Sequence, residues 1–360
     1  MRKVTIPIES HKIKNMNANE RVKRALNFDN PDKVPIRHQA LPAGLYEHGQ
    51  KLINLWRKIP GDFGNMANVQ VPHPEPKDIT ADGSYHRVWT DDWGVEWEEA
   101  VYGIVGHPQS RPLNDISKLK DYQPPPVPSP TGPEFEKEKV RVSEHIKQYY
   151  LLDGWINLFE IMHAVRKFED VLVDIMEDTK EINQLADMIM EQRIGAVKYL
   201  VTRGCDGIMM ADDWGSQDAL LVSPEVWRRF FKPRYSRIAA EIKKAGVDVW
   251  YHTCGHILPL FDDLCSVGYD VLWPQLSAND NKLLAAKFRE HKIAMEIHMD
   301  RQRLMPFGRP EEIMAAVKKA RKIFDTKDGG IIWHAEIDNG VPYENVKALI
   351  EAFEENRKYL

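Results

Sequence analysis

The sharpest chemical signal in the sequence is a histidine and a cysteine two residues apart, His252 and Cys254, within the run Tyr251–His256. In an extended chain, residues at this spacing point to the same side, so an imidazole and a thiolate can reach one cation. A nitrogen and a sulfur ligand suit a borderline-soft ion such as zinc. Gly255 allows the chain to turn directly afterwards. The alternative is a hydrogen-bonded buried histidine beside a buried free cysteine, a common structural arrangement.

Two adjacent carboxylates, Asp212 and Asp213, follow an apolar run and precede the turn Trp214–Gln217. A carboxylate in this place can act as a general acid or base, orient a substrate hydroxyl, or hold a ligating histidine in position. We take Asp213 as a candidate catalytic residue. The alternative is structural, because aspartate is also favoured as a helix N-cap and in Asx turns.

Three residues late in the chain, His298, His334 and Glu336, are competing candidates for the remaining ligands of such a metal site. His298 and Asp300 share one face of an extended strand, so we also take Asp300 as a candidate catalytic residue. His334 and Glu336 lie in the run Trp333–Glu336 and offer a nitrogen or an oxygen ligand. An isolated histidine in such a run is otherwise a hydrogen-bonded core residue. No spacing rule selects among the three.

These candidates stand where short β-rich runs end. The second half of the sequence repeats a helical stretch, a short β-rich run and then polar residues, which is typical of βα units. We expect strands at residues 207–210, 247–251, 269–273, 293–299 and 330–334, and two earlier ones at 34–37 and 149–152. Serial βα units favour the α/β class and a single (β/α)8 TIM-type barrel, with a doubly wound open sheet as the alternative. The catalytic groups of such a barrel lie at the carboxyl ends of its strands.

The domain organisation follows from shifts in composition. We expect an N-terminal extension over residues 1–18 and one barrel domain over residues 19–360. Residues 44–131 are rich in proline and tryptophan, and we interpret them as an insertion near the barrel mouth. The run Gln123–Pro130 contains too much proline to form a helix or a strand. Trp89–Trp97 alternates aromatic and polar residues and predicts a hairpin, in which Trp93 and Trp97 could line a pocket.

The bulk composition argues against several classes of protein. The 360 residues are 43% hydrophobic, and no run reaches the about 18 apolar residues that cross a bilayer. The first residues, Met1–Lys14, are charged and lack the apolar stretch of a secretory signal. A net charge of −5 with scattered lysines and arginines is unlike a nucleic-acid-binding surface. Three cysteines do not form a disulfide framework, so we expect a cytoplasmic protein.

Several segments spread along the chain are similar to segments of a known protein family. They are Asn19–Phe28, Asp32–Pro35, Asp213–Gln217, Pro224–Trp227, Phe307–Glu312 and Val341–Val346. Together they resemble the uroporphyrinogen decarboxylase superfamily, which also contains zinc- and corrinoid-dependent methyltransferases. The resemblance spans residues 19–360 and implies a single (β/α)8 barrel.

Local features distinguish the branches of this superfamily. The decarboxylases carry an arginine-rich motif near the first strand, where Pro35–Ala40 keeps one arginine, and a late histidine that corresponds to Ala335. The methyltransferase branch has a His-x-Cys motif after a mid-barrel strand, which His252 and Cys254 resemble. In the methyltransferases that act on thiols, the third zinc ligand is a late cysteine, and it too corresponds to Ala335. The resemblance therefore implies either an altered ligand set or an incomplete site.

The function implied by the resemblance is zinc-dependent methyl transfer between a small methylated substrate and a corrinoid (cobalamin) carried by a separate protein. Asp213 and Asp300 would support the zinc ligands or handle protons. An altered ligand set would suit a methoxylated or methylamine-type donor rather than coenzyme M.

Two other functions stay open at this point. A decarboxylase or lyase of the uroporphyrinogen decarboxylase type would act on a small carboxylated molecule without an essential metal, using His38, Asp213 and Arg37 for binding and proton transfer. A noncatalytic binding barrel would have lost its site at Ala335. The sequence does not identify the methyl donor or acceptor, and it leaves the oligomeric state open, a homodimer included.

Overall fold

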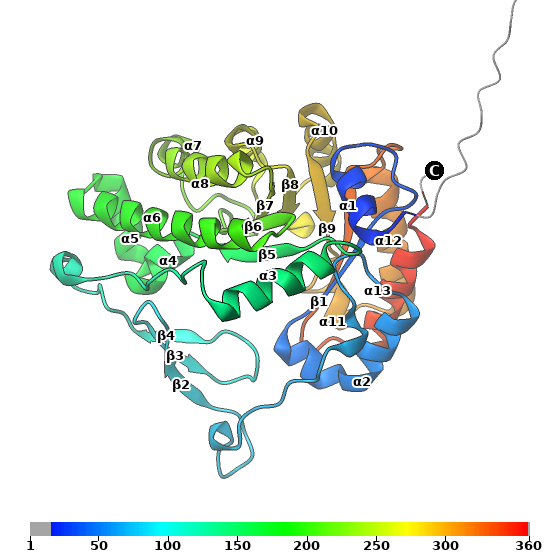
Figure 1. The fold of residues 1–360 in the computed structure, drawn as a ribbon, viewed down its shortest axis with the longest axis horizontal. Coiled ribbons are helices and arrows are strands. Elements are labelled where there is room, and N and C mark those ends of the chain that lie inside the picture. The colour runs from blue at the N-terminus through cyan, green and yellow to red at the C-terminus, as the bar shows by residue number, and fades with distance from the viewer. Residues whose placement is uncertain (1–15, 359–360) are drawn as a thin grey trace, which may run out of the picture.

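The computed structural model describes residues 16–358, so residues 1–15 of the expected N-terminal extension lie outside the described residues. The main sheet has seven parallel strands in the order β1-β10-β9-β8-β7-β6-β5. These strands are β1 (Ile36–Ala40), β5 (Leu152–Ile156), β6 (Gly207–Ala211), β7 (Asp248–Thr253), β8 (Val271–Pro274), β9 (Ala294–Ile297) and β10 (Ile331–Ile337). Figure 1 shows the sheet curling at the centre of the molecule, with helices around its outside.

The helices mostly connect consecutive strands. They are α1 (Ala18–Leu26), α2 (Pro42–Lys58), α3 (Pro133–His145), α4 (Phe159–Val165), α5 (Phe168–Glu177), α6 (Lys180–Arg203), α7 (Pro224–Val226), α8 (Lys232–Lys244), α9 (Phe261–Val267), α10 (Asn281–His291), α11 (Leu304–Phe307), α12 (Pro310–Phe324) and α13 (Tyr343–Glu355). Short helical turns are η1 (Met66–Asn68), η2 (Pro76–Asp78), η3 (Ile116–Asp121), η5 (Leu258–Leu260) and η6 (Leu276–Ala278), and the π-helical η4 (Trp227–Phe231) joins α7 to α8. No helix among the described residues has the length and apolar character needed to span a membrane.

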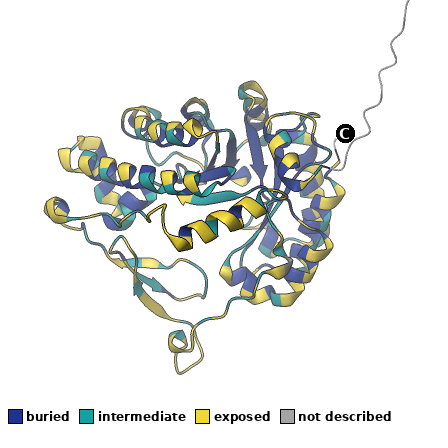
Figure 2. Ribbon diagram, viewed as in Figure 1, coloured by how far each residue is buried: buried dark blue, intermediate teal, exposed yellow. Residues whose placement is uncertain are grey.

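Side chains alternate between two apolar layers along each strand. One large cluster lies between the sheet and the helices, and a smaller cluster fills the inside of the curled sheet. In β7, for example, Val249 and Tyr251 belong to the outer cluster and Trp250 to the inner one. Figure 2 accordingly shows buried strands at the centre and helices whose outward sides are exposed. A doubly wound sheet would carry helices on both faces, so the curled sheet with an internal core favours the barrel-type expectation.

The expected strands are present, with shifted ends. β7 continues to Thr253, so His252 lies inside the strand rather than after it. β9 ends at Ile297, so His298 and Asp300 lie beyond the strand in which they were expected. The earliest strands start later than expected, β1 at residue 36 and β5 at residue 152. Strand ends depend on the pairing partner as well as on local composition, which explains these shifts.

An eighth strand of the expected barrel is not found in residues 16–358. Between β1 and β5 the chain instead passes through Asp62, whose backbone N–H donates to the carbonyl of Ile36 at 2.8 Å. The carbonyl of Asp62 accepts from the N–H of Tyr150, just before β5, at 3.1 Å. The backbone of Asp62 therefore links β1 to the residue before β5, and these are the two edge strands of the sheet.

The region 44–131, expected as an insertion, contains both a helix packed on the sheet and a separate small sheet. Its first part is α2, whose Leu52 and Trp56 are buried in the outer cluster, so the helix belongs to the barrel wall. A separate antiparallel sheet follows, made of β2 (Arg87–Thr90), β3 (Glu96–Glu99) and β4 (His107–Ser110). The predicted hairpin is confirmed, because β2 pairs with β3. Figure 1 shows this small sheet away from the curled sheet, and no helix or strand forms at residues 123–130.

The carboxylate of Asp62 joins three distant parts of the chain. It accepts hydrogen bonds from Arg21 of α1 at 2.5 Å, from Arg357 after α13 at 2.6 Å, and from the backbone N–H of Ile36 at 2.7 Å. Asp62 is 2% exposed, and both arginines are buried as well. A buried ion pair whose remaining polar atoms are bonded is costly to break, because the surviving charges have no solvent to compensate them.

We therefore expect Asp62→Ala to lower the free energy of unfolding by about 3 kcal/mol, because it breaks two buried ion pairs and leaves the N–H of Ile36 without its acceptor. Arg21 would still pair with Asp32, and Arg357 with Glu354. Urea denaturation followed by circular dichroism measures the change. Asp29→Ala is the control, since the side chain of Asp29 is 64% exposed and its removal should alter stability by less than about 0.5 kcal/mol. Equal stabilities of the two variants would refute this role of Asp62.

Candidate metal centre

Three potential ligands converge where β6 and β7 end. An oxygen of Asp213, Nε2 of His252 and Sγ of Cys254 all lie within 4.8 Å of one another. His252 Nε2 is 3.3 Å from Cys254 Sγ and 3.8 Å from Asp213 Oδ1. Around a tetrahedral zinc ion with bonds of about 2.0–2.3 Å, neighbouring ligand atoms are about 3.4–3.6 Å apart. The three side chains therefore fit one zinc ion with little movement.

The ring of His252 is held with one nitrogen toward the other two ligands. Its Nδ1 is 3.0 Å from the backbone carbonyl of Trp273. A carbonyl only accepts, so Nδ1 carries the proton and donates, which leaves the lone pair of Nε2 free beside Cys254 and Asp213. Burial lowers the pKa of His252 to about 4, although Asp213 opposes the shift. The imidazole is thus neutral near pH 7 and has the tautomer that a metal ligand needs.

Two glycines bring Asp213 to the β7 side of the site. The N–H of Gly215 donates to the carbonyl of Cys254 at 3.2 Å. A Cβ on Gly255 would lie 1.9 Å from the carbonyl oxygen of Gly215, and Gly255 has φ +83. The two loops therefore touch backbone to backbone, in a conformation that favours glycine at 255. This contact lets Asp213 Oδ1 accept the N–H of Cys254 at 2.7 Å.

His298 and His334 are not part of this group, and both contact the ring of Trp273. The indole N–H of Trp273 donates to Nδ1 of His298, so the proton of a neutral His298 is on Nε2, which makes that atom a donor rather than a ligand. Nε2 of His334 is 3.2 Å from the side-chain oxygen of Gln39, and its ring lies 4.4 Å from that of Trp273. Burial lowers the pKa of both histidines, so both are neutral.

Glu336 is not brought to the three ligands either, and its partner is an arginine that the sequence analysis missed. Arg301 Nη1 is 2.7 Å from Glu336 and 3.5 Å from Asp338. Burial raises the pKa of Glu336 to about 7, against the opposing charge of Arg301. Burial and the charge of Asp213 raise the pKa of the Cys254 thiol, and Arg301, which lines the same cavity, opposes that rise with its positive charge. No motif or spacing around Arg301, which follows Asp300 in a loop, indicates from the sequence that it lies near the site.

Strand alternation takes His38 away from the site. Arg37 and Gln39 face the interior, where they contact Glu296 and His334. His38 faces the helices instead, with Nε2 2.8 Å from the carbonyl of Ile59. The catalytic role expected for His38 therefore has no geometric support.

The same alternation applies to Ala335, which pairs with His38 and belongs to the outer cluster. The side chains of His334 and Glu336 on either side of it face inward. A larger side chain at position 335 would also face the helices and would not reach the candidate ligands. The alanine at this position therefore does not remove a ligand from the candidate site.

The remaining carboxylates cap local structure. Asp300 accepts the N–H groups of Gln302 at 2.9 Å and Arg303 at 3.2 Å, so the structure does not bring it to the three ligands. Asp212 is fully buried and accepts three backbone N–H groups at the start of α4. Asp212 thus has the structural role of capping a helix start, whereas Asp213 lies with the candidate ligands.

Two cavities meet at Asp213. One, of about 530 Å³, contains Cys254, His298 and Arg301 in its wall. The other, of about 580 Å³, includes Trp93, Trp97, Trp155 and Phe159 in a wall that also has aliphatic and charged side chains, and we call it the aromatic cavity. The candidate metal centre therefore opens on a polar space and on an aromatic one.

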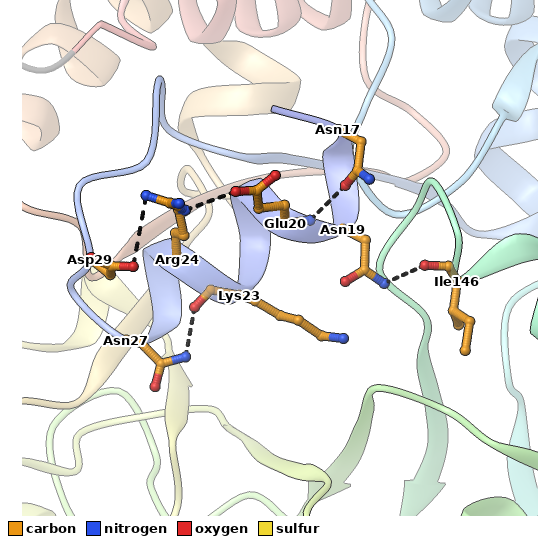
Figure 3. Close-up of a pocket in the computed structure, with 8 residues that line it drawn as sticks. All are labelled: Asn17, Asn19, Glu20, Lys23, Arg24, Asn27, Asp29 and Ile146. Carbon is orange, nitrogen blue, oxygen red and sulfur yellow. Dashed lines mark hydrogen bonds and ion pairs between the residues drawn. The ribbon is translucent and has the colours of Figure 1, made fainter. Parts of the chain in front are cut away.

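A further hollow, of about 430 Å³, lies beside α1 near the amino ends of the strands. Figure 3 shows that its polar side chains bond mostly to nearby backbone groups, while Arg24 pairs with Glu20 at 3.1 Å and with Asp29. It contains none of the candidate site residues.

Comparisons with known proteins agree with this architecture. The family model described as uroporphyrinogen decarboxylase (URO-D) matches residues 155–356. No curated protein matches the chain. A solved methyltransferase from Methanosarcina mazei is similar with a TM-score of 0.65 at 18% identity, over 95% of this chain and 99% of that one. A B12-independent methionine synthase from a Shewanella species, solved with selenomethionine, has a TM-score of 0.45 at 12% identity, over 86% of each chain. At these identities the first likeness shows the fold alone, and the second is too weak to carry an argument.

We expect Gly255→Ala to disrupt the candidate metal centre by separating the two loops. It should lower the free energy of unfolding by about 2–5 kcal/mol, from left-handed strain plus overpacking, and weaken zinc affinity at least about tenfold. Urea denaturation and competition with a chromogenic chelator measure the two effects.

Gly246→Ala is the matched control, because Gly246 has φ +72 with nothing within 4 Å of an added Cβ. Gly246→Ala should lower the free energy of unfolding by about 1–2 kcal/mol, from backbone strain alone, and should leave zinc affinity unchanged. Identical zinc affinities in the two variants would show that the loop contact does not support the ligands.

Proposed function

The chain belongs to the uroporphyrinogen decarboxylase family, and on that premise we propose that it is a zinc-dependent methyltransferase. The reaction moves a methyl group between a small methylated substrate and a corrinoid carried by a separate protein. The observation that carries the proposal is the convergence of Asp213, His252 and Cys254 at the carboxyl ends of adjacent strands. Within a barrel-type fold this is the edge where catalytic groups gather.

The donor set favours zinc over other ions. A thiolate, an imidazole and a carboxylate match the ligand types and distances of zinc sites, and three protein ligands leave one position for a substrate. In such a site zinc acts as a Lewis acid toward the heteroatom that bears or receives the methyl group. The resemblance to the Methanosarcina mazei methyltransferase is compatible with this proposal without identifying the substrate.

The surrounding side chains support the same chemistry. The carbonyl of Trp273 keeps His252 in the ligating tautomer. Burial and Asp213 raise the pKa of the Cys254 thiol against the charge of Arg301, so a bound zinc ion would supply the further positive charge that a thiolate needs. His298 lines the cavity beside Cys254 and can donate its Nε2 proton to a substrate atom. The cavity of about 530 Å³ lies beside Cys254, and a corrinoid carried by a separate protein would approach the candidate metal centre from this side.

A metal-free decarboxylase or lyase fits the geometry less well. That reaction was expected to use His38, Asp213 and Arg37, but His38 faces the helices. Arg37 donates to Glu296 at 2.7 Å and also contacts Gln39, so its guanidinium is already engaged. Asp213 alone of the three lies in the candidate site.

We expect the protein purified without chelators to carry about one zinc ion per chain, as a three-ligand protein site would. Cys254→Ser should lower zinc affinity more than about 100-fold, because a thiolate ligand is lost. Metal analysis by mass spectrometry after gel filtration measures the content. Cys265→Ser, which changes a half-buried cysteine of α9, should keep its zinc. Wild-type protein that contains no transition metal would end the zinc proposal.

The methyl-transfer proposal has a separate activity test. Wild-type protein is incubated with reduced cobalamin and a panel of methylated thiols, methylamines and methoxylated compounds, and formation of methylcobalamin is followed by absorbance. We expect one class of donor to react in the wild type and in Cys265→Ser, and none to react in Cys254→Ser. Carbon dioxide release from a carboxylated compound, unaffected by Cys254→Ser, would favour the decarboxylase instead.

A further inference from the structure

The aromatic cavity of about 580 Å³ is built from parts that are distant in the sequence. Trp93 and Trp97 come from the segment around β3, Trp155 from β5, and Arg193 from the middle of α6. Asp213 lies in the same wall, and the ring of Trp155 is 5.8 Å from that of His252. The cavity therefore adjoins the candidate metal centre and has a volume typical of small-molecule sites.

Arg193 is a positive charge without a carboxylate partner. Its Nε donates to the side-chain oxygen of Gln192 at 2.7 Å, and its guanidinium lies 5.1 Å from the ring centre of Trp93. Among the described residues no carboxylate is bonded to either Nη nitrogen, and burial lowers the pKa of Arg193 to about 10 with no acidic neighbour to oppose it. Partly buried cations are ordinarily paired. Arg193 is therefore ready to pair with an anionic ligand.

The cavity wall also contains three acidic residues, Asp91, Glu160 and Asp213, and each has partners within the protein. Asp91 accepts the backbone N–H groups of Trp93 and Val95 and the indole N–H of Trp97, each within 2.9 Å. Glu160 accepts from Asn157 at 2.7 Å, and burial raises the pKa of Glu160, which favours its neutral form. Asp213 is directed toward His252 and accepts the N–H of Cys254, so its charge belongs to the candidate metal centre. Arg193 is the positive charge that this wall offers to a ligand.

We infer that this cavity binds a small aromatic carboxylate, with the acid group on Arg193 and the ring among the three tryptophans. A guanidinium that stacks on an aromatic face still presents its edge for two parallel hydrogen bonds to a carboxylate. Indole faces and edges give a planar ring favourable offset and edge contacts. The inference names a substrate class for the proposed methyltransferase and so rests on that proposed function.

The position of Asp213 explains how a ligand bound to Arg193 would reach the candidate metal centre. Because Asp213 lies in the walls of both cavities, the end of the ring away from Arg193 can face the candidate ligands. Arg193 then acts as a residue that determines specificity, and the metal ligands are untouched by the acid group.

The inference is tested by binding, which needs no methyl transfer. Isothermal titration calorimetry of the full-length protein uses benzoate as the probe, with phenol and benzyltrimethylammonium as neutral and cationic comparisons. We expect saturable benzoate binding and no detectable binding of either comparison compound. Arg193→Gln should weaken benzoate binding at least about tenfold, because the charged hydrogen bonds are lost. Arg193→Lys should recover part of it, since the charge remains without the planar fork.

Matched variants separate the possible causes. Arg237→Gln removes an exposed arginine of α8 that pairs with Glu191 and should bind benzoate like the wild type. Cys254→Ser should lose zinc and still bind benzoate, which distinguishes the cavity from adventitious carboxylate binding at a metal. Trp155→Ala should weaken binding as well, and circular dichroism verifies that each variant is folded.

The inference is overturned if the wild type shows no saturable benzoate binding up to about 10 mM, beyond the millimolar affinities of weak ligands. It is also overturned if benzyltrimethylammonium binds in place of benzoate, or if folded Arg193→Gln binds benzoate like the wild type. Loss of benzoate binding in Cys254→Ser would place the acid group on the metal and would refute the role of Arg193. Failure of the methyl-transfer assay would leave each of these binding results intact, so the two proposals fail separately.

Discussion

The contact between the loops that follow β6 and β7 is the constraint on which the candidate site depends. Gly215 and Gly255 meet backbone to backbone, and no side chain could occupy either position without moving the loops apart. Because the loops touch, the carboxylate of Asp213 reaches the two ligands that the β7 end places side by side. Neither loop alone holds three ligands, so the site exists only as a property of the packed pair.

The interior of the curled sheet changes character along its length. Toward the amino ends of the strands it is apolar and is covered by α1, and Asp62 binds Arg21 of α1 and Arg357 after α13 at the gap between β1 and β5. One side-chain layer further on, Trp273 contacts His252, His298 and His334 and orients the first two through its carbonyl and its indole N–H. Stability and chemistry are thus separated along the strands, as in other barrels built from βα units.

The candidate metal centre serves two spaces of different chemistry. The polar cavity contains Arg301 and His298, which can handle charge and protons beside Cys254. The aromatic cavity depends on tryptophans from the small antiparallel sheet segment and on Arg193 of α6. The proposed methyl transfer, between a small molecule and a group carried on a separate protein, would use both cavities. In this arrangement the residues outside the curled sheet would set which small molecule is accepted, while the strand ends hold the reacting groups.

The sequence by itself determined the parallel α/β architecture, the family, the β2–β3 hairpin and the pairing of His252 with Cys254, because each depends on local pattern or on a spacing of two within one strand. Only the tertiary structure decided that Asp213 is the third group beside them, that His38 and Ala335 face outward, and that Asp300 caps a turn. It also revealed Arg301 and Arg193, which had no motif of their own. One physical reason is that a shift of one residue in a strand moves every side chain to the opposite face of the sheet. The other is that loop contacts join residues far apart in the sequence, such as Asp213 and Cys254, which are 41 positions apart. Neither the exact strand limits nor such contacts are encoded in any short window of the chain.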